Sequence, residues 1–519
     1  MNADGLRPTK VIAMFLLVNS FLMANASGIL SAAKEVIDTV PPSLNTVEIM
    51  LHEGRYATEH FSSHLPLIVF DTPIANNDAR DAPLSVAMRT INWEDMPGNS
   101  LDSPSIAFNA ELLRVAPPDQ TILPKSDYYI HIKTQDNSLQ HFSLAGMSPG
   151  GEWLLLGSMR DKSLLRNYLA YIVAGLLGAE IPEMKFCEVF IREEDRYNYQ
   201  GVYLLVRDTR QIVRYYTVDA LDTPDMNQLV LLRSPLNNQP LILDTQASRE
   251  KSPSGYLSLP YPADAIVPAL LNQVTTRINA LESALYSDNP VEFSTYTNYV
   301  DVDSFVTYVI VNGLFGNVDA GYRALYTYDT LSEKVTAVPF ISFDTTLDND
   351  VSVPLEVTKT YLDTAPWLDR IMKSKPFLDS LTVRYRTAWR TELPDKLIDQ
   401  LIDEAVAHLG PAQARDWTRW HEDYKSADLA LEPSQDFADS GELSHYTRIR
   451  EMDTYDEEII KIKYMLHTRG QYLITALSEL QDKRDTIAPA DNYVRNSLSF
   501  IGYLCLFILS IRIVRVRTR

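Results

Sequence analysis

The sequence predicts an α+β protein whose first half is rich in β-strands and whose second half is rich in α-helices. Short apolar or alternating segments bounded by turn residues recur in the first half, whereas helical periodicity dominates after residue 266. No segment repeats along the 519 residues. We therefore expect one domain with two lobes, and not a chain of separate modules.

The first half contains five segments with the features of strands. They are apolar or alternate between apolar and polar side chains, and they cover residues 65–72, 84–91, 128–133, 185–191 and 201–206. The last two are expected to pair, because the polar, turn-prone residues 192–200 join them. A helix is expected over residues 163–177, with Asp161 or Ser163 as its cap. Residues 209–262 contain several prolines and are expected to be rich in loops.

The second half is expected to be mainly helical. Helical periodicity covers residues 267–286, 302–314, 377–392, 396–409 and 453–480. Residues 324–328 and 335–343 are expected to form a hairpin with a turn over residues 329–333. Trp417 and Trp420 stand three residues apart on one face of an expected helix, so we expect both to be buried structural side chains.

The composition excludes several classes of partner and site. Acidic side chains outnumber basic ones by 68 to 47, which gives a formal net charge of −21. A charge of this sign repels nucleic acid, and the sequence has no basic stripe in the middle of the chain. We therefore expect no nucleic-acid partner. The two cysteines, Cys187 and Cys505, are too few for a disulfide framework or a cysteine zinc site.

Residues 1–26 have the features of a secretory signal peptide. A basic start precedes a short apolar run, and the small residues Ala24 to Ala26 form an A-x-A cleavage site. We expect cleavage after Ala26, and the alternative is an uncleaved anchor or a buried first helix. Residues 27–60 are polar and irregular and are expected to be a lead-in or stalk. The only N-x-[ST] site of the chain, at Asn25, lies at the cleavage point, which favours a bacterial origin.

The other end of the chain predicts a membrane anchor. Residues 498–511 are almost entirely apolar, and an arginine-rich tail follows them. Basic residues that flank an apolar helix face the cytoplasm. We therefore expect a transmembrane helix over residues 495–515 and a basic cytoplasmic tail over residues 516–519. The protein would then be a single-pass type I protein with its main domain, residues 61–490, outside the cytoplasm. A helix docked on the core is the alternative.

Two aspartates are the main candidates for chemistry. Asp319 stands before the expected hairpin and Asp344 stands after it, at nearly equal distances from Leu331 in the turn. If the hairpin folds about Leu331, both carboxylates return to its open end, where they could hold Mg²⁺ and leave positions for phosphate. Kinases use this layout, with a base aspartate before a hairpin and a metal aspartate after it. The alternative is that both aspartates only cap turns.

Four further segments, together with these aspartates, resemble the spore coat protein H (CotH) kinase-like family over about residues 60–480. The segments are L-P-L-I-V-F-D-T (65–72), L-P-K-S-D-Y-Y-I (123–130), G-E-W-L-L-L-G-S-M-R-D-K-S-L-L-R-N-Y-L-A-Y (151–171) and Y-Q-G-V-Y-L-L (199–205). The third segment is the most specific of them.

The resemblance implies a two-lobed atypical protein-kinase-like fold and transfer of the ATP γ-phosphate to serine in extracellular or coat proteins. It implies that Asp319 accepts the proton of the substrate hydroxyl and that Asp344 holds Mg²⁺ or Mn²⁺. Lys125, Lys162 and Arg166 are the candidate cations for the phosphates of ATP, although Lys162 and Arg166 could instead form a solvated helix face. The acceptor is left open between a surface or secreted protein and a polymer, and the partner between a surface or secreted protein and a polysaccharide-assembly partner.

Three positions depart from the family pattern and leave two functions open. Ser342 replaces the first aspartate of a W-D-x-D motif, Ala324 replaces the asparagine of N-x-Y-x-Y, and Arg207 replaces a glutamate after the G-V-Y-L-L strand. Asp319 and Asp344 favour a membrane-tethered extracytoplasmic kinase. The three replacements favour the alternative, which is a catalytically weakened kinase-like scaffold with a non-enzymatic role in surface binding or assembly.

Overall fold

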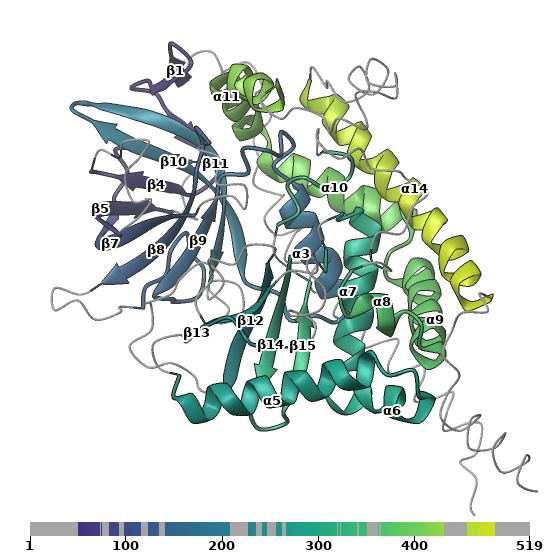
Figure 1. Cartoon of the computed structure of the whole chain (residues 1–519). Helices are drawn as coiled ribbons and strands as arrows, with labels where there is room; N and C mark the ends of the chain where they lie inside the picture. Colours follow the sequence, from purple (N-terminus) through teal and green to yellow (C-terminus); the bar gives the residue numbers. More distant parts are fainter. Residues whose placement is uncertain are drawn as a thin grey trace, which may run out of the picture.

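The chain folds into a β-rich lobe and an α-rich lobe, as the sequence predicts (Figure 1). The computed structural model describes residues 50–72, 74, 83–92, 98–115, 123–133, 141–207, 227–234, 241–245, 256–261, 266–318, 320–321, 323–339, 342–349, 362, 365–429 and 454–482. The large sheet lies on one side of Figure 1 and most of the helices lie on the other. The mixed α+β class is therefore confirmed.

The first lobe is built on a nine-stranded sheet in the order β1-β2-β11-β10-β4-β5-β7-β8-β9, which closes on itself because β9 also pairs with β11. Its strands are β1 (Leu51–His52), β2 (Tyr56–Ala57), β4 (Leu67–Phe70), β5 (Leu84–Ile91), β7 (Ile106–Val115), β8 (Asp127–Lys133), β9 (Glu152–Leu156), β10 (Met184–Glu193) and β11 (Arg196–Arg207). β4 runs parallel to β10, whereas β10 and β11 form a long antiparallel pair. A separate small ladder joins β3 (Ser62–Ser63) to β6 (Asn99–Ser100).

A bulge interrupts the pairing of β10 with β11 at the glycine of the Y-Q-G-V-Y-L-L segment. The register shifts between Val189 and Phe190, which pair with Gly201 and Tyr199, so that Gln200 is the extra residue. Gly201 has a φ of 97°, in the region that side chains disfavour and that bulges commonly use. The conformation of this bulge therefore explains the glycine in the segment.

The second sheet has four antiparallel strands in the order β13 (Tyr256–Tyr261), β12 (Gln228–Ser234), β14 (Ala324–Asp329) and β15 (Lys334–Val338). α5 (Pro268–Leu285) runs across one end of this sheet (Figure 1), where Arg277 Nε donates to the backbone oxygen of Glu333 at 3.2 Å. The other helices are α3 (Arg166–Leu176), α6 (Pro290–Ser294), η4 (Thr295–Asn298), α7 (Val302–Phe315), α8 (Leu368–Ile371), α9 (Lys375–Thr391), α10 (Asp395–Leu409), α11 (Pro411–Leu429) and α14 (Tyr455–Asp482).

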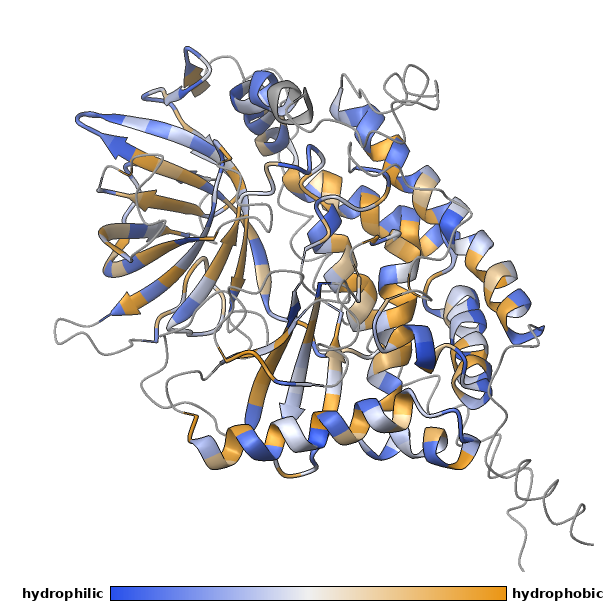
Figure 2. Ribbon diagram, in the orientation of Figure 1, coloured by the Kyte–Doolittle hydropathy of each residue, from blue (hydrophilic) through white to orange (hydrophobic). Residues whose placement is uncertain are grey.

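One large apolar core joins the second sheet to the helices of the α-rich lobe (Figure 2). α7 contributes most of its side chains to this core, and α14 packs against α9 so closely that a Cβ at Gly470 would lie 1.7 Å from Trp389. α3 belongs to the same core through Leu169 and Val173, although it precedes β10 in the sequence. The first residues of α3 are thereby fixed between the two lobes (Figure 1).

Most of the expected elements are present, but four strands of five or more residues and the four two-residue strands β1, β2, β3 and β6 were missed. The expected strands correspond to β4, β5, β8, β10, β11, β14 and β15, and the expected helices to α3, α5, α7, α9, α10 and α14. No strand was expected at β7, β9, β12 or β13. β12 lies within the region 209–262 that was expected to be loop-rich, because its buried Leu-Val-Leu-Leu run does not alternate and so lacks the signature of a half-buried strand.

The N-terminal region differs from its expected structure, and the expected membrane segments fall outside the described residues. The expected lead-in, residues 27–60, contains β1 and β2, and its Leu51 is buried. The expected signal peptide over residues 1–26 and the expected transmembrane helix over residues 495–515 lie outside the described residues. Among the helices that the structure describes, none is both long enough and apolar enough to span a bilayer.

Candidate functional site

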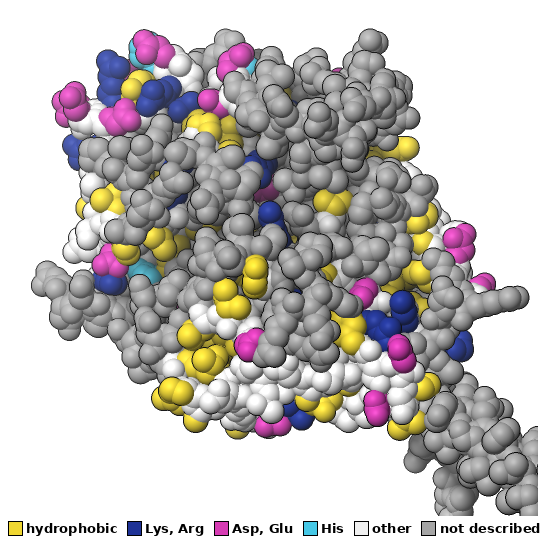
Figure 3. Space-filling model, in the orientation of Figure 1, with side chains coloured by type: hydrophobic (Ala, Val, Ile, Leu, Met, Phe, Trp, Pro, Cys, Tyr) yellow, Lys and Arg dark blue, Asp and Glu magenta, His cyan; other side chains and the backbone are white. Residues whose placement is uncertain are grey.

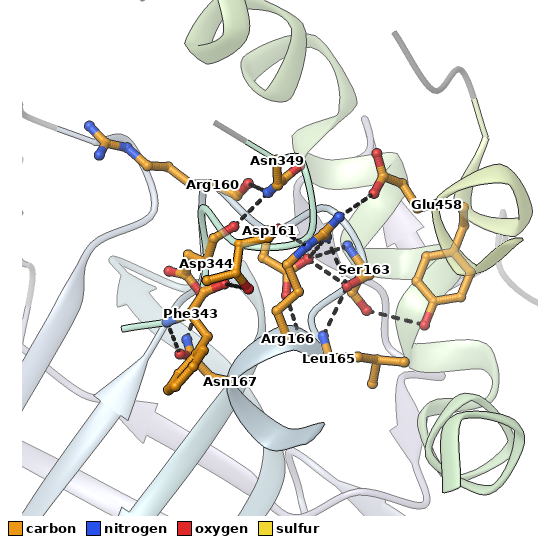
Figure 4. A network of polar contacts seen from close by, with 12 residues as sticks. Arg160, Asp161, Ser163, Leu165, Arg166, Asn167, Phe343, Asp344, Asn349 and Glu458 are labelled. Atoms are coloured by element: carbon orange, nitrogen blue, oxygen red, sulfur yellow. Dashed lines mark hydrogen bonds and ion pairs between the residues drawn. The ribbon is translucent and has the colours of Figure 1, made fainter. Parts of the chain in front are cut away.

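Asp344 lies in a turn after β15, beside the first residues of α3 (Figure 4). Asn167 Nδ2 donates to Asp344 Oδ1 at 2.5 Å, while Asn167 Oδ1 accepts from the backbone N–H of Phe343 at 2.8 Å. The Ser158 hydroxyl also donates to the Asp344 carboxylate. The Asp344 carboxylate is therefore held by two side chains, in a residue that is half-buried.

A second carboxylate, Asp127 at the start of β8, shares Ser158 with Asp344. Asp127 Oδ1 accepts the backbone N–H of Gly157 at 2.6 Å, and the backbone N–H of Ser158 donates to the same carboxylate. Burial raises the pKa of Asp127 to about 6. Burial, followed by the charge of Asp127, raises the pKa of Asp344 well above its usual value. The pair thus combines hard oxygen donors with an excess of negative charge, which is the chemistry that Mg²⁺ and Mn²⁺ prefer.

The protein supplies few metal ligands at this pair. Within the described ranges, no group of three or more His, Cys, Asp or Glu side chains is arranged to hold a metal ion. Mg²⁺ is commonly bound through one or two carboxylates, and water and phosphate oxygens fill its remaining positions. The two carboxylates fit this mode of binding, and they do not fit a metal enclosed by protein ligands alone.

Lys125, which was expected to bind phosphate, is buried and ion-paired. Its Nζ lies 2.7 Å from Asp416 Oδ1, and neither side chain is more than 2% exposed. Asp416, on α11, also accepts the backbone N–H of Val202 and the hydroxyl of Tyr424. Burial lowers the pKa of Lys125, and the charges of Asp416, Asp127 and Asp344 oppose that shift. The buried ammonium of Lys125 therefore attracts both carboxylates of the site, Asp127 and Asp344, electrostatically.

Arg166 is a structural residue in this arrangement, and its expected role at phosphate is not supported. Its guanidinium is fully buried and binds Asp161, Glu458 on α14, and the backbone oxygen of Thr346 (Figure 4). These contacts engage all three of its nitrogens. Arg166 thus ties the Asp344 turn to α3 and α14.

Lys162 is also buried, and only 8% of it is exposed. Its charge is one of those that lower the pKa of Glu458, after the larger contributions of Arg166 and Lys461. The alternative of a solvated helix face is therefore wrong for both Lys162 and Arg166. Among the predicted site residues, Lys125 and Arg166 act electrostatically with Asp344, whereas Lys162 is linked to Glu458.

Asp319 lies outside the described residues, so its expected meeting with Asp344 remains a prediction. The described residues around it are well anchored. α7 ends at Gly316 with a φ of 63°, and Asn317 Nδ2 donates to Asn312 Oδ1 at 2.9 Å. On the other side, the backbone N–H of Gly321 donates to the hydroxyl of Tyr308 at 2.9 Å. The hairpin itself forms as expected, from β14 and β15.

Comparison with known proteins identifies the family. A family model described as "CotH kinase protein" matches residues 119–473, which is more than half of the chain. The chain belongs to the CotH kinase family. The match includes every residue discussed above as a site candidate, and the strands β1 to β7 precede it. No curated protein gives a significant match.

The three departures from the CotH kinase pattern occupy different environments. Ala324 is fully buried in β14 and pairs with Arg233 of β12. Ser342 is exposed, two residues before Asp344. Arg207 lies 3.0 Å from Glu183 in an ion pair at the end of β11. Of the three, only Ser342 adjoins the Asp344 turn in the sequence.

Sequence reasoning missed three residues of the site, namely Asp127, Asn167 and Asp416. Asp127 stands two residues after Lys125 in a segment that resembles the CotH kinase family, and Asn167 directly follows Arg166. The sequence pointed to Asp127 and Asn167 only through their closeness to Lys125 and Arg166, which were already site candidates. Asp416 gave none, because it is 291 residues from Lys125 in the sequence.

A groove of about 450 Å³ on α10 is separate from this site. Lys396, Asp399, Gln400, Asp403, Glu404 and Ala407 line it. None of these residues contacts Asp344 or Asp127, and the three carboxylates of the groove disfavour phosphate. On the face drawn in Figure 3, the described acidic and basic side chains are mixed over the β-rich lobe. We therefore place the candidate site at the Asp344 turn and not at the groove.

Proposed function

We propose that this CotH kinase family member is a membrane-tethered, extracytoplasmic kinase that transfers the ATP γ-phosphate to a surface or secreted protein or polymer. The observation that supports it most is the pair of carboxylates Asp127 and Asp344, joined by Ser158 and lying near the buried Lys125. Family membership implies ATP and a divalent metal, and the oxygen donors of this pair suit such a metal.

Each residue has a distinct task in this proposal. Asp344 and Asp127 bind Mg²⁺ or Mn²⁺, which neutralises phosphate charge during transfer. Asp319 accepts the proton of the acceptor hydroxyl. Asp416 holds Lys125 in place, as a helix carboxylate holds the strand lysine in protein kinases. Lys162 remains a candidate for a phosphate contact.

The tether is part of the same proposal. The signal peptide over residues 1–26 and the helix over residues 495–515 would place the main domain outside the cytoplasm, with the arginine tail inside. Protease treatment of intact cells should then remove the main domain and leave a short tail fragment. A main domain protected until the cells are lysed would contradict this orientation.

The activity is tested with the full-length protein, labelled ATP, and Mg²⁺ or Mn²⁺. We expect Asp344→Ala to abolish the metal-dependent thermal stabilisation by ATP, because it removes a metal ligand. We expect Asp319→Ala to keep that stabilisation and to lose phosphoryl transfer, because its task is at the acceptor. If the wild-type protein binds no nucleotide with any divalent ion, the kinase proposal fails.

The second candidate function is a catalytically weakened scaffold that binds or assembles surface components. It is favoured by Ala324, whose buried methyl group offers no ligand where the family has an asparagine. With one amide ligand lost, a second metal would be held poorly, so Mn²⁺ should support nucleotide binding better than Mg²⁺. Nucleotide binding without transfer to any tested acceptor would favour this candidate over the kinase.

A further inference from the structure

Asn167 binds Asp344 with one end of its side-chain amide and the neighbouring Phe343 with the other (Figure 4). Its Nδ2 donates to Asp344 Oδ1, and its Oδ1 accepts from the backbone N–H of Phe343. Only 4% of Asn167 is exposed, so water does not compete for either contact. Two neighbouring groups, one backbone and one side chain, are thus bound by a single amide.

These two contacts fix the orientation of the amide. Its oxygen faces an N–H donor and its nitrogen faces a carboxylate, and a rotation by 180° would place an acceptor against an acceptor and a donor against a donor. Phe343 is itself held, because it is buried and packs edge-on against Phe315 at 5.3 Å. Asn167 therefore presents a fixed donor to Asp344.

The residue before Asn167 holds the other side of the same turn. Arg166 Nε donates to the backbone oxygen of Thr346 at 3.0 Å, and its terminal nitrogens bind Asp161 and Glu458. The first two residues of α3 thus hold the turn on both sides of Asp344. Since α3 is part of the main core, this support is rigid.

We infer that Asn167 is the positioning residue of Asp344, which it orients for metal binding without being a ligand itself. The amide nitrogen of Asn167, and not its oxygen, contacts the Asp344 carboxylate, and a nitrogen that donates its hydrogens is no metal ligand. Asn167 therefore does not replace the amide ligand lost at Ala324. The inference rests on the proposed function, because it assumes that Asp344 binds a divalent ion.

Asn349 provides a matched control in the same turn. Its Nδ2 donates to the backbone oxygens of Asp344 and Arg160, at 2.6 and 2.5 Å. It stabilises the backbone of the turn, and no described contact joins it to the Asp344 carboxylate. A comparison of Asn167 variants with an Asn349 variant therefore distinguishes a misoriented Asp344 carboxylate from a general loss of structure in the turn.

The experiment compares four full-length proteins: wild type, Asn167→Ala, Asn167→Ser and Asn349→Ala. For each one, calorimetry gives the Mn²⁺ affinity with and without ATP, and thermal unfolding gives the melting temperature. We expect both Asn167 variants to bind Mn²⁺ about 10- to 100-fold more weakly, the usual effect of removing a group that orients a metal ligand. Serine at position 167 is too short to reach the carboxylate, and it guards against a failure of the alanine variant to fold. Asn349→Ala should lower the melting temperature and weaken Mn²⁺ binding by less than the roughly tenfold that is the smallest effect expected for the Asn167 variants.

Two results would overturn the inference. Either the Asn167 variants bind Mn²⁺ as tightly as wild type, or Asn349→Ala weakens binding by as much as they do. In both cases Asp344 does not depend on this amide for its orientation. Absence of Mn²⁺ binding in the wild-type protein would be a different result, because it would contradict the proposed function itself.

Discussion

Gly201 of β11 and Asp416 of α11 approach so closely that a Cβ atom at position 201 would lie 2.2 Å from Asp416 Oδ1. The same atom would lie 2.8 Å from Trp420 Nε1. Gly201 is thus needed for two reasons, which are its positive φ and the close approach of the helix. The glycine in the β10–β11 bulge therefore leaves the space that the Asp416 carboxylate occupies when it binds Lys125.

Replacement of Gly201 by alanine should displace α11 and separate Lys125 from Asp416. We expect a loss of about 4 kcal/mol or more in the free energy of unfolding, from backbone strain and a broken buried ion pair. Gly178→Ala is the control, because Gly178 has a φ of 93° but a Cβ there would meet nothing within 4 Å. It should cost only about 1–2 kcal/mol. Equal losses in urea denaturation would show that the close approach of α11 is unimportant.

Trp420 should contribute more to stability than Trp417. Trp420 is 2% exposed and its Nε1 donates to the backbone oxygen of Gln200 at 2.9 Å, whereas Trp417 is only half-buried. We expect Trp420→Ala to cost about 3–5 kcal/mol and Trp417→Ala about 1–2 kcal/mol in chemical denaturation. Trp420→Phe should keep most of the packing, and its free energy of unfolding should be about 1 kcal/mol below that of wild type because the hydrogen bond is lost. A larger loss for Trp417 than for Trp420 would contradict this ranking.

The buried ion pair of Glu188 with Arg415 should behave as one unit. The guanidinium binds both carboxylate oxygens, at 2.9 and 2.6 Å, and the Tyr199 hydroxyl donates to Glu188 at 2.6 Å. Arg415→Met should cost about 3–5 kcal/mol, because it leaves Glu188 buried without its cation. Adding Glu188→Leu should restore part of that loss. The free energies of unfolding of Arg415→Met, Glu188→Leu and the double variant give the coupling energy between the two residues. Additive losses would mean that the residues act independently.

His408 should make the protein less stable in mild acid. Burial lowers its pKa to about 4, and the nearby charges of His64 and Lys185 act in the same direction. The unfolded chain takes up the proton near the usual pKa of 6.5, so the free energy of unfolding falls as the pH drops below 6.5. This contribution stops changing near pH 4, after a total loss of about 1–3 kcal/mol.

Urea midpoints measured between pH 4 and 7.5 test the effect of His408. His408→Gln should flatten the pH dependence over that range, because the variant has no proton to gain. His60→Gln is the control, since the His60 side chain is 75% exposed. A profile that is the same in wild type and His408→Gln would assign the acid sensitivity to other groups.

Local sequence patterns predicted the elements better than they predicted the site. Periodicity identified the hairpin of β14 and β15, and counting outward from its turn led to Asp344. The partners of Asp344 could not be found in this way, because Asn167 reaches it from a helix 177 residues earlier. Spacing along one hairpin is a local property, whereas this contact depends on how α3 packs in the core.

The role of charged residues was the least predictable part. Lys125 and Arg166 were both expected to face phosphate, and in the structure each is paired with a buried carboxylate from a distant helix, Asp416 or Glu458. A sequence records that a residue is cationic, but not whether a carboxylate is brought to it by the fold. Burial decides this, since a charge removed from water requires a partner.

The site is completed by two late segments of the chain, α11 and the first turn of α14. Asp416 is 291 residues from Lys125, and Glu458 is 292 residues from Arg166. Contacts of such sequence separation close slowly, and during synthesis they cannot form before both partners exist. A growing chain therefore has the Asp344 turn and its hairpin well before it has the helices that support Lys125 and Arg166. Until residues 416 and 458 have been synthesised, Lys125 and Arg166 lack the carboxylates that pair with them in the folded protein.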